Sequence, residues 1–88
     1  NTKSTKSISR IISRGPLVLS KNNNVYNKAV VYDVIGRRIK TIIPEGGKLK
    51  WKMDDKDGRK VKNGIYFIHI EGESVEINEK VVYIGGEE

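Results

Sequence analysis

The sequence predicts an all-β domain, an antiparallel sandwich of about six or seven short strands. Apolar and polar residues alternate along several runs, with the period of two that a half-buried strand requires. The clearest run has three apolar residues on one face and three lysines on the other: Leu49, Trp51, Met53 and Lys48, Lys50, Lys52. Glycine, proline, asparagine and aspartate interrupt such runs about every 8–12 residues. No segment has the period that predicts a helix.

The first part of the chain is predicted to consist of a polar N-terminal segment and two short apolar segments. Residues 1–7 are polar and should form a linker or frayed terminus. Residues 8–12 form a short apolar segment that ends before Gly15-Pro16, and residues 17–19 follow as a strand. Three asparagines at 22–24 predict a loop, because asparagine favours turns over regular structure.

The next segment predicts a β-hairpin. Residues 29–33 have high β propensity, and residues 38–42 return as the partner strand, with Ile39 inward and Lys40 outward. Gly36 lies in the turn between them, where it takes positive φ at little cost.

A second hairpin is predicted across residues 51–70. Its turn is the Asp54–Gly58 segment, which includes Asp57 and tolerates positive φ. In the returning strand, one face carries Tyr66, Ile68 and Ile70, and the other carries Ile65, Phe67 and His69.

The last strand is predicted over residues 75–84, after a turn at 72–74. Val81 and Tyr83 should lie on the opposite face from Val82 and Ile84. The sandwich domain is therefore expected to span residues 8–84, with residues 85–88 as a tail. A chain of 88 residues can bury one thin core but cannot build a deep catalytic cleft.

Composition excludes several classes of protein. The chain has no cysteine, so it has neither a disulfide framework nor a thiolate metal site. No apolar run approaches the roughly 18 residues of a membrane-spanning helix. The sequence starts at Asn1 without a signal-peptide pattern, and we expect it to be a piece of a longer protein.

No residue set predicts catalysis, a cofactor or a metal centre. The acidic turn at 54–58 is similar to a calcium loop, but Ile65 stands at the twelfth position, where that loop needs a bidentate glutamate. His69 is the single histidine and alternates with Phe67, so we interpret it as a packed or half-exposed strand residue. The sequence therefore predicts a protein that is not an enzyme.

The net charge of +6 raises the question of a polyanionic partner. Six basic residues define a candidate basic face for an anionic glycan or cell-wall polymer: Arg37, Arg38, Lys40, Lys48, Lys50 and Lys52. The alternative is that strand lysines form a solvated face that prevents edge-to-edge aggregation. Each aromatic residue lies in an apolar run, which argues against stacking on nucleic acid.

An ordered series of motifs runs through residues 25–84. It comprises VYDVIGRRIKTI at 31–42, Trp51, Asp54, Asp57-Gly58-Arg59, NGIYF at 63–67 and KVV at 80–82. The series resembles the C-terminal sorting domains (type A) of the type IX secretion system. It is equally similar to the Ig-like domain of flagellar hook-capping proteins. The resemblance implies an Ig-like (fibronectin III-like) sandwich at the end of a larger secreted protein.

The resemblance also implies roles for particular residues. The last strand, through Lys80, Val81, Val82 and Ile84, would be presented to the secretion translocon by strand addition or side-chain readout. Trp51 would fill the core, and Gly64 before Tyr66 would occupy a site where a Cβ clashes or is strained. Two departures stand out: Lys62 replaces a usual proline, and Ile84 replaces the second lysine of a Lys-x-x-x-Lys pattern.

The resemblance implies a non-catalytic secreted or cell-surface domain that acts as a sorting signal and attaches its parent at the outer membrane. Its partners would be the secretion machinery or neighbouring domains of the parent chain. Two alternatives stay open: a module that binds an anionic polymer, and a structural spacer or assembly domain.

Overall fold

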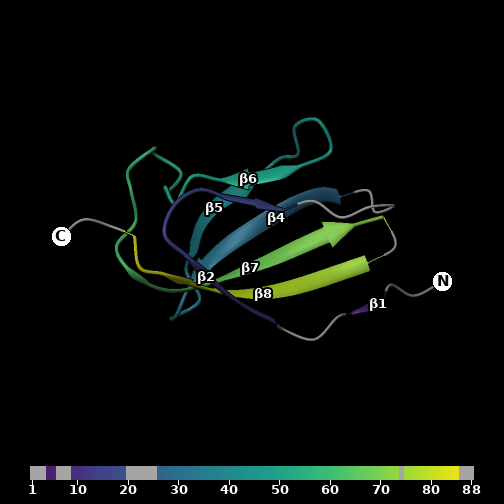
Figure 1. The fold of residues 1–88 in the computed structure, drawn as a ribbon. Coiled ribbons are helices and arrows are strands. Elements are labelled where there is room, and N and C mark those ends of the chain that lie inside the picture. The colour runs from purple at the N-terminus through teal and green to yellow at the C-terminus, as the bar shows by residue number, and fades with distance from the viewer. Residues whose placement is uncertain (1–3, 6–8, 20–25, 74, 86–88) are drawn as a thin grey trace.

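A computed structural model describes residues 4–5, 9–19, 26–73 and 75–85, which form strands and turns without a helix (Figure 1). The strands in chain order are β1 (Ser4–Thr5), β2 (Ser9–Ser13), β3 (Leu17–Leu19), β4 (Tyr26–Asp33), β5 (Arg38–Ile42), β6 (Leu49–Trp51), β7 (Gly64–Gly72) and β8 (Val75–Tyr83). The short strand β1 falls within the segment expected to be a linker or frayed terminus. The loop predicted at 22–24 and the end of the tail, 86–88, lie outside the described residues.

The strands form a large sheet and a small one, which confirms the predicted all-β sandwich. The large sheet has the order β1-β8-β7-β4-β5, and β2 also pairs with β8; the small sheet is β3-β6. The pairs within β4, β5, β7 and β8 are antiparallel, as predicted, whereas β1 and β2 run parallel to β8. Alternation shows which face of a strand is buried but carries no information about the direction of its neighbour.

The predicted hairpin across residues 51–70 is wrong. Strand β6 pairs with β3 in the small sheet, with Trp51 opposite Leu17, whereas β7 pairs with β4 and β8 in the large sheet. The chain leaves β6 through Met53, whose φ of 59° is left-handed, and through a bridge between Asp54 and Lys60. The two alternating runs therefore bury their apolar faces against each other from opposite layers.

Trp51 occupies the centre of the core, as predicted. Its side chain is 1% exposed, and its ring meets the ring of Tyr66 edge to face at a centroid distance of 5.6 Å. Burying an indole is worth roughly 2–3 kcal/mol. The small sheet and the turn after it supply Leu49, Trp51 and Met53, and the large sheet supplies most of the other buried residues: Tyr26, Ala29, Val31, Ile42, Tyr66, Ile68, Ile70, Ile77, Val81 and Tyr83.

Strands β4 and β5 form the first predicted hairpin, with Gly36 at a φ of 88° in its turn. A β-bulge leaves Ile39 without a partner on β4 and places Lys40 opposite buried Val31. The prediction that Lys40 points outward is therefore wrong, since the extra residue shifts the register by one. Ile39 packs against the core, as predicted.

A backbone hydrogen bond joins the end of β2 to the residue that follows β8. The Ile84 N–H donates to the Ser13 carbonyl at 3.0 Å, and Ser13 is only 9% exposed. Gly85 follows so closely that a Cβ built on it would overlap the backbone of Arg14. The chain can run past β2 at this point only because residue 85 has no side chain.

We expect Gly85→Ala to lower the free energy of unfolding by about 1–3 kcal/mol, because overlap with backbone must be relieved by movement of β2 or β8. Urea unfolding followed by the fluorescence of Trp51 measures the loss, and hydrogen exchange at the Ile84 amide locates it. Gly15→Ala is the matched control, since a Cβ at residue 15 meets nothing within 4 Å. Equal stability of the two variants would contradict the proposed close approach.

Candidate functional site

Strand β8 divides its candidate recognition residues between two faces of the large sheet. Val81 is fully buried at 0% exposure and packs in the core. Lys80 and Val82 are half-buried on the outer face, and Ile84, just beyond the strand, is 40% exposed. Three of the four residues can therefore be contacted from solvent, whereas Val81 serves the core.

Val82 lies in an apolar row that crosses three strands. It is opposite Ile12 on β2 and opposite Ile65 on β7. Ile12 is 61% exposed and Ile65 is 37% exposed. We call Ile12, Ile65, Val82 and Ile84 the outer strip. Contiguous exposed apolar residues of this kind mark interaction surfaces on soluble proteins.

The sequence reasoning missed the contribution of Ile12. The signal available was the adjacent pair Ile11-Ile12, which must face opposite sides of a strand. Ile11 does pack against the core, which leaves Ile12 outside. Because a parallel partner several tens of residues away cannot be read from local alternation, its position beside Val82 was not predictable.

Both edges of β8 are hydrogen-bonded. Strand β7 pairs with it along one side, and β2 pairs along the other from Glu79 to Tyr83. An incoming strand would have to displace β2 before it could pair with this part of β8. The side chains of the outer strip need no such displacement.

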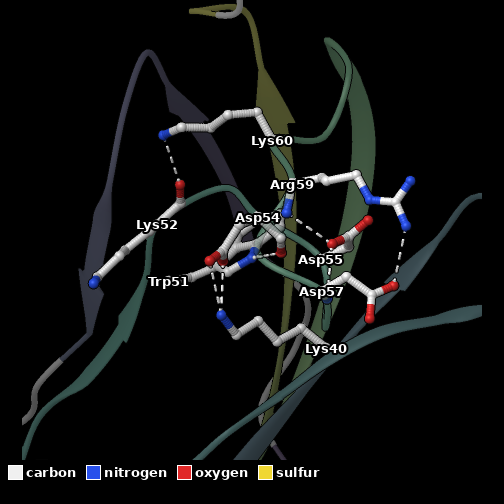
Figure 2. Close-up of polar contacts among 8 residues, drawn as sticks. All are labelled: Lys40, Trp51, Lys52, Asp54, Asp55, Asp57, Arg59 and Lys60. Atoms are coloured by element: carbon white, nitrogen blue, oxygen red, sulfur yellow. Dashed lines mark hydrogen bonds and ion pairs between the residues drawn. The ribbon is translucent and has the colours of Figure 1, made fainter.

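The acidic turn after β6 binds donors from its own chain (Figure 2). The Trp51 indole N–H donates to the Asp54 carbonyl at 2.9 Å, while Lys40 Nζ lies 2.8 and 2.9 Å from the two Asp54 carboxylate oxygens. The Asp55 carboxylate accepts the N–H groups of Asp57 and Arg59, both at 2.9 Å. The turn thus links β5 to the small sheet and uses its carboxylates internally.

The arrangement explains the residues that were predicted to shape this turn. Asp57 pairs with the guanidinium of Arg59 at 3.3 Å, and Gly58 takes a φ of 85° while its N–H donates to the Asp55 carbonyl. Within the described ranges, no group of three His, Cys, Asp or Glu side chains is placed to hold a metal ion. His69 Nδ1 lies 2.7 Å from Asn78 Oδ1 in the neighbouring strand.

Gly64 and Tyr66 open strand β7. Gly64 has a φ of 157°, and a Cβ built there meets nothing within 4 Å, so backbone conformation and not a clash sets it apart. The Tyr66 hydroxyl donates to the Lys62 carbonyl at 2.6 Å. This bond holds the segment before β7 without the proline usual at that position.

The six residues of the candidate basic face lie in different surroundings. Lys40, Lys48, Lys50 and Lys52 surround a hollow of about 590 Å³ beside β5 and β6, which Glu45 also lines. Arg37 is held at the β4–β5 turn by Asp33 at 2.8 Å, and Arg38 lines a separate hollow with Lys56. The structure brings four of the six together, and one of these, Lys40, is already paired with Asp54.

The comparison with family models decides the family. The model for the secretion system C-terminal sorting domain matches residues 13–84 of this chain. The chain belongs to this family. A comparison with curated proteins gives no match.

The sorting domain family accounts for the all-β fold and for a role as a C-terminal signal for type IX secretion. Proteins with this signal are secreted or attached at the cell surface. The family is a sorting-signal family and not a catalytic one. None of the described residues of the sorting domain forms a helix capable of crossing a membrane.

Backbone donors shift the pKa of two carboxyl groups in the sorting domain. The N–H of Arg59 lowers the pKa of Asp55 below its ordinary value of 3.8, and the N–H of Asp57 adds to this effect. Burial raises the pKa of Asp33, but the N–H and the guanidinium of Arg37 together lower it by more than burial raises it. The net shift of the Asp33 pKa is therefore downward. Burial raises the pKa of the Tyr66 hydroxyl, with a smaller contribution from Asp33.

We expect the sorting domain to lose stability in acid through Asp55. Its lowered folded-state pKa means that the ionised group stabilises the fold above pH 3.8, and that this contribution disappears as pH falls through the lowered value. Asp55→Asn should therefore be less stable than the parent at neutral pH, and the difference should vanish in strong acid. Urea unfolding at a series of pH values measures this. A difference that stays constant across the series would rule out the linkage.

Proposed function

We propose that the type IX secretion machinery recognises this domain through the side chains of the outer strip and the neighbouring Lys80. The observation that carries the proposal is the row from Ile12 through Val82 to Ile65, which exposes apolar side chains around the last strand. The family match supplies the class of partner.

Side-chain readout is favoured over strand addition at β8. Strand addition requires unpaired backbone groups, and β2 already pairs with β8 along Glu79–Tyr83. Lys80, Val82 and Ile84 instead face the same side of the sheet, so one partner surface can contact all three. In this arrangement the exposed Ile84 offers an apolar contact where related domains usually carry a second lysine.

The proposal extends to attachment of the parent protein. A domain recognised on the outer face of its large sheet keeps its core and both edge contacts of β8 intact during recognition. It can therefore remain folded while it holds the parent at the cell surface. Neighbouring domains of the parent chain would be the other partners.

The structure favours this function over a general anionic-polymer module. Two of the six candidate cations are already neutralised, since Arg37 pairs with Asp33 and Lys40 with Asp54. Of the other four, Lys48, Lys50 and Lys52 line one hollow, whereas Arg38 lines another. A spacer or assembly role has no separate observation in its favour.

The test is surface display of a reporter fused to residues 1–88 in a host with a type IX system. Val82→Thr combined with Ile84→Thr should abolish most of the display, because both changes remove apolar contacts while keeping β-branched side chains. The matched control is Val34→Thr with Ile35→Thr, a valine and an isoleucine that are 62% and 72% exposed at the β4–β5 turn.

Thermal unfolding of each purified domain separates recognition from folding. The outer-strip variant should unfold within a few degrees of the parent, since the changed side chains lie outside the core. Full display of this variant, or equal loss in the control variant, would refute the proposal.

A further inference from the structure

The large sheet has an open edge at β5, on the side opposite β8. Among the described strands, β5 pairs only with β4. The Ile39 carbonyl points away from β4 and accepts the N–H of Lys56 at 3.0 Å. On β4, the N–H and C=O of Asp33 both bond to the β4–β5 turn, so by alternation the backbone groups of Val31 and Ala29 face β5, where their partners are Lys40 and Ile42. Thr41 lies between these partners and therefore directs its N–H and C=O to the open side.

The open edge borders the hollow between β5 and β6. Its apolar lining includes Ile42, Ile43 and Val18, of which Ile43 is 64% exposed and Val18 is 48% exposed. Its cationic lining includes Lys48, Lys50 and Lys52, all exposed, which alternate with the buried residues of β6. Glu45 is the one carboxylate among the described residues that line the hollow, and Lys40 is neutralised by its ion pair with Asp54. The lining therefore carries a net positive charge.

We infer that this hollow binds an extended acidic segment of a partner protein, which adds to β5 as a further strand. The Ile39 carbonyl is taken by Lys56, so the main-chain hydrogen bonds of strand addition would come from the edge at Thr41 and beyond. The apolar and cationic linings suit the alternating side chains of such a segment. Charge complementarity selects an acidic partner.

Two other occupants fit less well. The described residues that line the hollow include no aromatic side chain on which a sugar ring could stack. A second copy of this chain would bring its own basic β5 edge and a net charge of +6 against the same lysines. The acidic segment uses both the edge and the charge.

This inference is independent of the proposed sorting role. The outer strip lies around β8, and the hollow lies at the other end of the strand order, beyond β5. The secretion machinery and the acidic segment would therefore occupy different parts of the surface and could bind together.

The probe is a fluorescein-labelled peptide of about ten residues in which glutamate alternates with valine or threonine, a pattern typical of a strand. Binding to the complete 88-residue chain is followed by fluorescence polarisation. Lys48→Glu combined with Lys50→Glu should weaken binding about tenfold or more, because it reverses two charges at the hollow. The matched control is Lys28→Glu with Lys62→Glu, two exposed lysines that do not line it, and it should change binding less than about twofold.

Two further measurements test the edge itself. The same peptide N-methylated at alternate residues keeps its charge and side chains but loses strand donors, and it should not bind. Thr41→Pro removes the outward N–H of β5, a change that an edge strand tolerates, and should also abolish binding.

Each contrary outcome overturns the inference. Equal binding of the methylated peptide would reduce the hollow to a non-specific cationic surface. Displacement of the peptide by heparin, with tighter binding of heparin at physiological salt, would assign the hollow to a polysaccharide. No binding of the unmodified peptide would leave the edge without this partner.

Discussion

The fold depends on the contact between the Trp51 indole and the layer opposite it. Strand β6 is only three residues long and pairs with an equally short β3, so hydrogen bonds alone cannot hold this small sheet. An isolated pair of strands is marginal in water. The buried edge-to-face contact between Trp51 and Tyr66 holds the small sheet against the large one. The indole N–H then fixes the Asp54 backbone, whose carboxylate reaches Lys40 on β5 (Figure 2).

This construction determines where function can reside. Two short strands cover the inner face of a much larger sheet, and apolar side chains of both sheets meet in the core between them. The outer face of β2, β8 and β7 has no covering layer among the described residues, and there exposed isoleucines surround Val82. A domain of this size gains specificity from a surface and not from a cavity, in keeping with a family whose role is to be recognised by other proteins.

Alternation in the sequence predicted the faces of the strands well. It placed Leu49, Trp51 and Met53 inside and the lysines at 48, 50 and 52 outside, because burial follows the period of two. It also separated Val81 from Val82. Alternation failed where pairing between distant segments decides the outcome, as with β6, which joins β3, and with β2, which runs parallel to β8. The bulge at Ile39 reversed Lys40 for the same reason, since register is a property of two strands together.

The candidate surfaces were predictable only in part, for related reasons. The motif series identified the last strand, but the outer strip also needs Ile12 and Ile65, which become neighbours of Val82 only after three strands align. The basic residues were visible in the sequence. The sequence did not show that Arg37 and Lys40 pair with carboxylates, or that the other lysines surround a hollow.

Strands β8 and β5 of the large sheet show two ways in which one domain can present binding surfaces. An unpaired strand edge attracts any other edge, and proteins protect such edges by covering or charging them. Strand β8 is paired with β7 on one side and with β2 on the other, so a partner recognises β8 through its side chains. At β5 the edge stays open beside lysines, which repel a second copy of this basic chain and attract an acidic strand. The same charge that opposes pairing with a second copy thus matches the chemistry of the partner that we infer for the open edge.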